Sequence, residues 1–274
     1  MTDYVNYWDN MSPYLDSIEN LFGINIRNLD PLYRFMQSPV LVVGAGQGLL
    51  VEVLRQKSFV AEGVDLSSQM VEFAEKRRNI KLFHANANKM PFQDKQFASS
   101  IVASGVIDFL NDSDQIRMII NEVKRVTSQQ GRIFVTFIGF TPADENLLRY
   151  AGVITPNDNL RMGAVIRTTL AGKNPAMVLG KELHRNRLGI MLRIIRSAMS
   201  LPKARLMAVL KAVKDVRKKI ESGELPDPKT FLDSVPEQVP VRNKDQIHKL
   251  FKDLNISLKN TFTFDNCTIV QLSE

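Results

Sequence analysis

The feature that most constrains the fold is the run "VLVVGAGQGLLVEVL", Val40 to Leu54. Its first four residues, Val40 to Val43, are the aliphatic residues typical of a buried parallel strand. Leu49 to Leu54 begin a helical pattern of apolar residues. The run therefore predicts a strand, a tight turn and a helix, which is either a ligand-binding unit or a plain strand-to-helix connection.

Three glycines, Gly44, Gly46 and Gly48, occupy alternate positions in that turn. Glycine there lets a ligand approach bare backbone, because a side chain would collide with it. The dinucleotide fingerprint needs a glycine at position 49, where this chain has Leu49. The turn therefore favours a ligand other than a nicotinamide dinucleotide.

The same strand-to-helix pattern recurs along the first half of the chain. A strand is expected over Ala61 to Leu66, a helix over Gln69 to Arg78 with Ser67 as its N-cap, and a third strand over Ile80 to Ala85. Two further strands follow, in "FASSIVASGVIDF" and "SQQGRIFVTFIGF", with the helix of "DSDQIRMIINEVKRV" between them. Five strands that alternate with helices predict a parallel, doubly wound sheet.

The end of the chain returns to this alternation. "NKDQIHKLFKDLNI" predicts an amphipathic helix, and "SLKNTFTF" and "CTIVQLS" predict two strands in a hairpin. The fold class is therefore α/β: a Rossmann-like, doubly wound, seven-stranded sheet with a C-terminal antiparallel hairpin and a helical insertion after the fifth strand. We expect a covering segment at 1–35, a core at 36–150 and 240–274, and a basic cap at 151–239.

The charge is concentrated in the insertion. Residues 161–220 hold fifteen Lys or Arg against Glu182 and Asp215, a net charge of +13, which leaves −6 for the rest of a chain whose total is +7. Helical patterns are expected over Lys181 to Ser200 and Lys203 to Ile220. Residues 161–220 include no Phe, Trp or Tyr, and five Met among many Leu, Ile and Val. The segment suits a lipid-like acceptor or an anionic membrane surface better than stacked nucleic-acid bases, or is a solvated charged face.

Two further positions carry candidate ligand contacts. Asp65 lies at the end of the second strand, where a carboxylate either accepts ribose hydroxyls or favours the dipole of the following helix. In "HANANKMPF", Ala85 and Ala87 leave space around Asn86 for the edge of an adenine. Cys267 is the single cysteine and the three histidines are far apart, so no metal site is expected.

Taken in order, these motifs resemble class I S-adenosylmethionine-dependent methyltransferases of the broad methyltransferase-11 and UbiE-like type. "VLVVGAGQG", "GVDLSSQMVEFAEKR", "ANANKMPF", "FASSIVASGVIDFLND" and "EVKRVTSQQGRIFV" are similar to successive motifs of that family. The resemblance covers about residues 36–140 and 240–272. It implies S-adenosyl-L-methionine as cofactor and methyl transfer as the activity.

The resemblance also implies roles for individual residues. Gly44, Ala45 and Gly46 would pass beneath the methionine part of the cofactor, and Asp65 would bind its ribose. Leu66 and Met70 would flank the adenine, Asn86 and Ala87 would meet its edge, and Ser104 would lie near the sulfonium. The chain departs from the family at Val42, Asn86 and Ala98, where an acid is usual.

No catalytic base is assigned from the sequence. Asp108 is either a residue of the site mouth or a loop cap, and the aromatic residues Tyr4, Tyr7, Trp8 and Tyr14 either cover the site or fasten their helix to the core. The expected acceptor is a small molecule or a lipid-like molecule. RNA methylation and a non-catalytic cofactor-binding protein are the alternatives. With no signal peptide or membrane-spanning run, a cytoplasmic location, at times peripheral to the membrane, is expected.

Overall fold

The computed structural model describes residues 2–18, 29–138, 142–170, 188–192, 214–215, 218–227, 235–264 and 267–273. The chain divides into two compact units. We call Ile24–Gly139 with Arg242–Glu274 the sheet unit, and Met1–Gly23 with Phe140–Val241 the basic unit. The three segments expected from the sequence remain a prediction.

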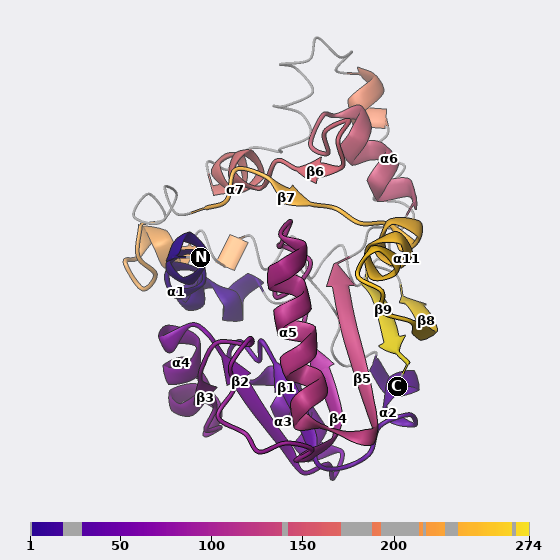
Figure 1. Ribbon diagram of the computed structural model, residues 1–274. Coiled ribbons are helices and arrows are strands. Elements are labelled where there is room, and N and C mark those ends of the chain that lie inside the picture. Colours follow the sequence, from indigo (N-terminus) through magenta and orange to yellow (C-terminus); the bar gives the residue numbers. More distant parts are fainter. Residues whose placement is uncertain are drawn as a thin grey trace. The chain divides into compact units, whose positions relative to one another are not determined.

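Seven strands form one sheet in the order β3-β2-β1-β4-β5-β9-β8 (Figure 1). The strands are β1 (Val40–Val43), β2 (Ala61–Asp65), β3 (Phe83–His84), β4 (Phe97–Val102), β5 (Thr127–Ile138), β8 (Leu258–Phe264) and β9 (Cys267–Leu272). The first five are parallel, and β9 pairs antiparallel with both β5 and β8. The predicted doubly wound sheet and C-terminal antiparallel pair are confirmed. Residues 265 and 266, expected to join that pair, lie outside the described residues.

The alternation of side chains along β1 divides the apolar core into two layers. Leu41 and Val43 belong to the cluster that includes residues of α5 (Ser113–Val126) and α11 (Lys244–Asp253). Val40 and Val42 belong to the cluster formed with α2 (Asp30–Tyr33), α3 (Leu49–Gln56) and α4 (Ser68–Arg78). Because both faces of β1 are covered, all four of its residues are apolar and buried.

Side-chain caps fix where three helices of the sheet unit begin. Ser67 accepts a hydrogen bond from the Met70 N–H, as the sequence predicts. Asp112 accepts from the first turn of α5, and Asn243 forms a reciprocal capping box with Gln246 at the start of α11. The Ser67 and Asp112 caps set the ends of the loops that follow β2 and β4.

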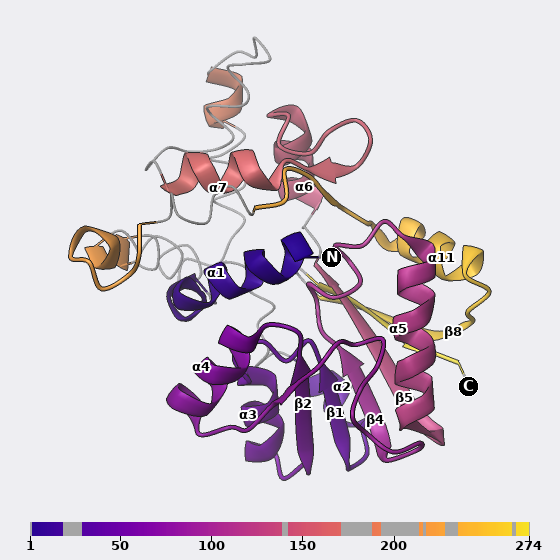
Figure 2. The ribbon, with the colours of Figure 1, turned by 60° about the vertical axis from the view of Figure 1, so that its left-hand side comes forward.

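The basic unit contains α1 (Thr2–Ile18), α6 (Pro142–Tyr150), α7 (Met162–Leu170) and a short antiparallel pair of β6 (Asn159–Leu160) and β7 (Val239–Pro240); the helices are labelled in Figure 2. The helices expected over 181–200 and 203–220 lie largely outside the described residues, although 188–192 are helical. In the described part of the chain, no helix is long and apolar enough to cross a membrane.

Candidate functional site

The glycine turn between β1 and α3 adopts a left-handed backbone at all three glycines. The φ angles are 73° at Gly44, 54° at Gly46 and 81° at Gly48. A Cβ at Gly44 would stand 2.2 Å from Cγ2 of Val106, whereas a Cβ at Gly46 would meet no atom within 4 Å. Gly44 is therefore required by packing, and Gly46 leaves its backbone open.

Asp65 ends β2 and is tied to that open backbone. Its Oδ2 accepts a hydrogen bond of 2.7 Å from the Gly46 N–H, and its Oδ1 accepts one of 2.9 Å from the Ser67 N–H. The N–H groups of Gly44 and Ala45 donate to the Val64 carbonyl. Two adjacent strand ends thereby hold the carboxylate in one position beside the turn.

The loop after β3 continues the same edge of the sheet. The Ala85 N–H donates to the Asp65 carbonyl at 3.0 Å, and His84 Nε2 donates to the Leu66 carbonyl at 3.0 Å. Asn86 Oδ1 accepts from the Asn88 N–H at 3.1 Å, closing a small turn. The predicted adenine-edge residues therefore lie in a loop that is bonded to the end of β2.

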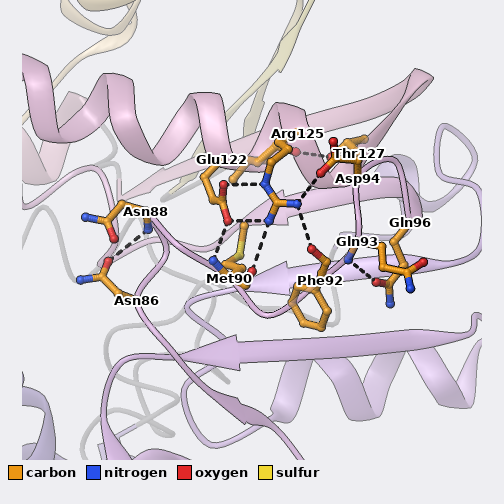
Figure 3. Close-up of polar contacts among 11 residues, drawn as sticks. Asn86, Asn88, Met90, Phe92, Gln93, Asp94, Gln96, Glu122, Arg125 and Thr127 are labelled. Atoms are coloured by element: carbon orange, nitrogen blue, oxygen red, sulfur yellow. Dashed lines mark hydrogen bonds and ion pairs between the residues drawn. The ribbon is translucent and has the colours of Figure 1, made fainter.

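Arg125 of α5 fastens the rest of this loop (Figure 3). Its guanidinium donates to the carbonyls of Met90 and Phe92 and pairs with Glu122 and Asp94. Glu122 also accepts from the Met90 N–H at 2.6 Å. The hydrogen bond from Arg125 lowers the pKa of Glu122 below its ordinary value. Arg125 and Glu122 thus fix the backbone that follows Asn86 through their hydrogen bonds to Met90 and Phe92.

Ser104 follows β4, which lies between β1 and β5 in the sheet. The Ala103 N–H donates to the Val43 carbonyl at 2.9 Å, and the turn passes through Gly105 at a φ of 92°. Ser104 thus lies in the loop that contributes Val106 to the packing of Gly44.

Asp108 stabilises the same loop with a buried side chain. Its side chain is 4% exposed, and its two oxygens accept from the N–H groups of Gly105 (2.5 Å) and Ile138 (3.3 Å). Arg242 donates to the carbonyls of Asp108 and Leu110. Of the two readings open at the sequence level, this geometry is that of a loop cap.

Burial has the largest effect on the pKa of the Asp108 carboxyl. Desolvation raises the pKa of Asp108 to about 6, and this rise is opposed by the backbone donors and the charge of Arg242. The buried thiol of Cys267 has its pKa raised to about 12, by desolvation first and by the Asp108 charge second.

The N-terminal aromatic residues belong to the basic unit. The rings of Tyr7 and Trp8 lie 4.9 Å apart between centroids. The Tyr14 hydroxyl donates to the Pro226 carbonyl at 2.5 Å, and burial, together with Asp227, raises the pKa of Tyr14 to about 12. Burial also raises the pKa of Tyr7. These hydroxyls are therefore neutral at physiological pH. The side chain of Tyr4 lies outside the described residues.

The structure thus brings most of the predicted site residues to one edge of the sheet. Gly44, Ala45, Gly46 and Asp65 are linked through β1 and β2, Asn86 and Ala87 follow β3, and Ser104 follows β4. Leu66 follows Asp65 directly, and Met70 is buried in the first turn of α4. Sequence reasoning missed the Arg125 anchor, whose only local signal is the spacing of Glu122 and Arg125 on one helix face.

Comparison with known proteins finds a family match over this part of the chain. Residues 40–131 match a family model described as a methyltransferase domain, and the matched range contains all nine predicted site residues. The match supports a class I methyltransferase. The methyltransferase-domain segment runs from β1 into β5 and so includes every loop described above.

The other similar proteins either match a short part of this chain or have low sequence identity to it. An uncharacterized protein of Methanocaldococcus jannaschii is 31% identical over 96 residues, and the match covers 35% of each protein, so the chain spans about a third of that relative's length. Two crystal structures share the fold. The PH0226 protein from Pyrococcus horikoshii has 17% identity and a TM-score of 0.50, over 91% of this chain and 89% of that one. A SAM-dependent methyltransferase from Methanosarcina mazei has 13% identity and a TM-score of 0.51, over 88% of this chain and 95% of that one.

The positions at which the matched segment departs from the usual pattern of such methyltransferases have a structural setting. Val42 is fully buried in β1 within the apolar cluster of α3 and α4. Ala98 lies in β4, and its N–H donates to the Pro39 carbonyl at 2.9 Å. Neither position belongs to the turn that holds Gly46 and Asp65, so that geometry does not depend on an acid at either one.

Proposed function

We propose that this chain transfers a methyl group from S-adenosyl-L-methionine to a small-molecule or lipid-like acceptor. The observation that carries the proposal is the hydrogen bond between the Gly46 N–H and the Asp65 carboxylate. It joins the open backbone of the glycine turn to a carboxylate at the end of the adjacent strand. A ligand with a ribose and a compact group over the turn matches that pair.

The residues at the sheet edge fit this cofactor. Gly46 has open space where a side chain would stand, so the methionine part can lie against the backbone. Asp65 is fixed by two backbone donors in a position to accept ribose hydroxyls. Leu66 and Met70 would flank the adenine, Asn86 and Ala87 would meet its edge, and Ser104 would lie near the sulfonium.

The bound cofactor supplies an electrophilic methyl group on a positively charged sulfur. The chain's own contribution is alignment and exclusion of water. The Arg125 anchor and the Asp108 cap hold the loops after β3 and β4 before any ligand arrives. We assign no general base, because Asp108 is buried in its cap and the Tyr14 hydroxyl stays protonated.

The proposed class of acceptor is inferred from the composition of the basic unit. Its residues 161–220 combine a net charge of +13 with apolar residues and no aromatic ring, which favours a lipid-like or amphiphilic acceptor over RNA. A UbiE-like subfamily and a location at the membrane periphery are part of the same proposal.

A transfer assay with labelled methyl groups tests the proposal. The protein is incubated with S-[methyl-³H]adenosylmethionine and, separately, with total lipid extract, a water-soluble metabolite extract and total RNA. We expect label in the lipid or small-molecule fraction and loss of transfer in Gly46→Ala. Gly223→Ala is the matched control, because Gly223 also has a left-handed φ (76°) and open space at its Cβ. Label only in RNA would contradict the acceptor class, and no transfer with any fraction would favour a non-catalytic protein.

A further inference from the structure

A short helical stretch of the basic unit, residues 188–192, exposes large apolar side chains. Leu188 and Leu192 are each 57% exposed and Met191 is 47% exposed, whereas Ile190 is fully buried. Full exposure of one aliphatic side chain is common on protein surfaces, but three within five residues form a patch.

Helix geometry explains how one stretch both packs and exposes apolar residues. At 100° per residue, Leu188, Met191 and Leu192 fall within an arc of about 100°, and Ile190 lies on the opposite side. Ile190 packs in a cluster with Ala151 and Val153 of the same unit. The stretch is therefore anchored through Ile190 and directs its three exposed side chains away from that cluster.

The sequence around this stretch is strongly cationic. Arg185 and Arg187 precede it, and Arg193 and Arg196 follow it. Residues 183–214 hold eight Lys or Arg and no Asp or Glu. Aliphatic side chains within a run of cations match a surface that offers an apolar layer beneath negative headgroups. Single-stranded RNA offers negative charge too, but its bases stack on rings, and residues 161–220 have none.

We propose that residues 188–192 dock on the surface of an anionic lipid bilayer. Leu188, Met191 and Leu192 enter the boundary between headgroups and acyl chains, and the cationic sequence on both sides of them supplies the attraction to negative headgroups. This stretch shares no residue with the Gly46 and Asp65 site, and its binding needs no methyl transfer.

Vesicle sedimentation tests the apolar part of the contact. The full-length protein is mixed with vesicles of phosphatidylcholine and phosphatidylglycerol, and with vesicles of phosphatidylcholine alone. We expect partition into the anionic vesicles, and a loss of about tenfold in the partition coefficient for Leu192→Ser and for Met191→Ser. Met118→Ser is the matched control, because Met118 of α5 is 48% exposed but lies in the sheet unit. It should partition like the wild type.

Charge and salt separate this contact from a purely electrostatic one. Reversal of Arg187 and Arg193 to Glu should abolish the preference for anionic vesicles. Between 50 mM and 500 mM salt, the wild type should keep part of its binding, because buried apolar area is not screened. Leu192→Ser and Met191→Ser should lose nearly all of it.

Three results would overturn the proposal. They are equal partition of the wild type and the Leu192 and Met191 variants, absence of partition by the wild type, and salt-sensitive binding of single-stranded RNA with no vesicle binding. A far-ultraviolet circular dichroism spectrum and melting temperature for each variant show that it is folded. Unchanged S-adenosylmethionine binding in the same variants keeps this test independent of the proposed function.

Discussion

In the glycine turn of the sheet unit, the groups offered to a ligand are backbone atoms and one carboxylate held by hydrogen bonds. In residues 188–192 of the basic unit, they are aliphatic side chains that are about half exposed. The first region is built from contacts between strand ends that are distant in sequence. The second is built from one buried anchor and the pitch of a helix.

This difference predicts whether a substitution in each region should change stability, binding or both. A pre-organised site shares its residues with the packing of the fold, so changes there should lower both stability and ligand affinity. An exposed patch shares little with the fold, so changes there should alter binding alone. Four predictions test this contrast, beginning with the largest expected loss.

The largest loss is expected for Gly44→Ala. The new Cβ would stand 2.2 Å from Val106 Cγ2, at a φ of 73° that disfavours alanine. Strain and overpacking together should lower the free energy of unfolding by about 3 kcal/mol, measured by urea denaturation. Gly223→Ala, which meets no neighbour, should lose only about 1 kcal/mol. Adding Val106→Ala should recover part of the loss at Gly44, and strictly additive effects would contradict this packing role.

The Asp108 cap predicts a pH dependence of stability. Burial raises the pKa of this carboxyl from 3.8 to about 6. Between these values, the folded chain binds a proton that the unfolded chain has released, so stability falls as pH rises. The difference in unfolding free energy between wild type and Asp108→Asn should shift by roughly 2 kcal/mol from pH 4 to pH 7, to the disadvantage of wild type. Parallel stability curves for the two proteins would show that Asp108 does not titrate in this window.

Removal of the Arg125 anchor should have a smaller effect. Arg125→Ala deprives the Met90 and Phe92 carbonyls of their donor and breaks two ion pairs, which should cost about 2 kcal/mol of unfolding free energy. Arg117→Ala on the same helix removes an exposed pair with Asp114 and should cost about 0.5 kcal/mol or less. S-adenosylmethionine affinity should fall in the first variant alone. Equal destabilisation of the two would mean that the loop does not depend on Arg125.

The smallest effect is expected in the exposed patch. Leu192→Ser should change the free energy of unfolding by less than about 0.5 kcal/mol. Ile190→Ala, at the buried anchor of the same stretch, should cost about 2 kcal/mol. Thermal denaturation of the two variants side by side measures the difference. A large loss in Leu192→Ser would place this side chain in the packing of the unit.

Most of the sheet unit could be predicted from local patterns. The strand over Val40–Val43, the Ser67 cap and the helices α4 and α5 follow from residue spacing within one element, which the sequence displays directly. The third strand was expected over Ile80 to Ala85, but β3 spans only Phe83–His84, because its pairing with β2 is limited to two residues. Strand length depends on the neighbouring strand, which a local pattern does not show.

The contacts that stabilise the candidate site could not be predicted from such local patterns. Arg242 donates to the carbonyl of Asp108, which is 134 positions away in the sequence. Val106, in the loop after β4, occupies the space that a Cβ at Gly44 would need. The type of residue at these positions gives no sign of its partner. The glycine turn and Asp65 could be predicted because each follows a strand, and the carboxyl ends of neighbouring parallel strands lie at one edge of the sheet.

The central claim is that Asp65 and the open backbone at Gly46 form the binding site for S-adenosylmethionine. Titration calorimetry with S-adenosylmethionine, using wild type, Asp65→Ala and the control Glu62→Ala from the same strand, tests it most directly. A hydrogen bond to a charged group contributes about 1.5 to 3 kcal/mol, so Asp65→Ala should bind roughly 10- to 100-fold more weakly than wild type. Glu62→Ala should bind like wild type. Equal affinity of wild type and a folded Asp65→Ala would contradict the account.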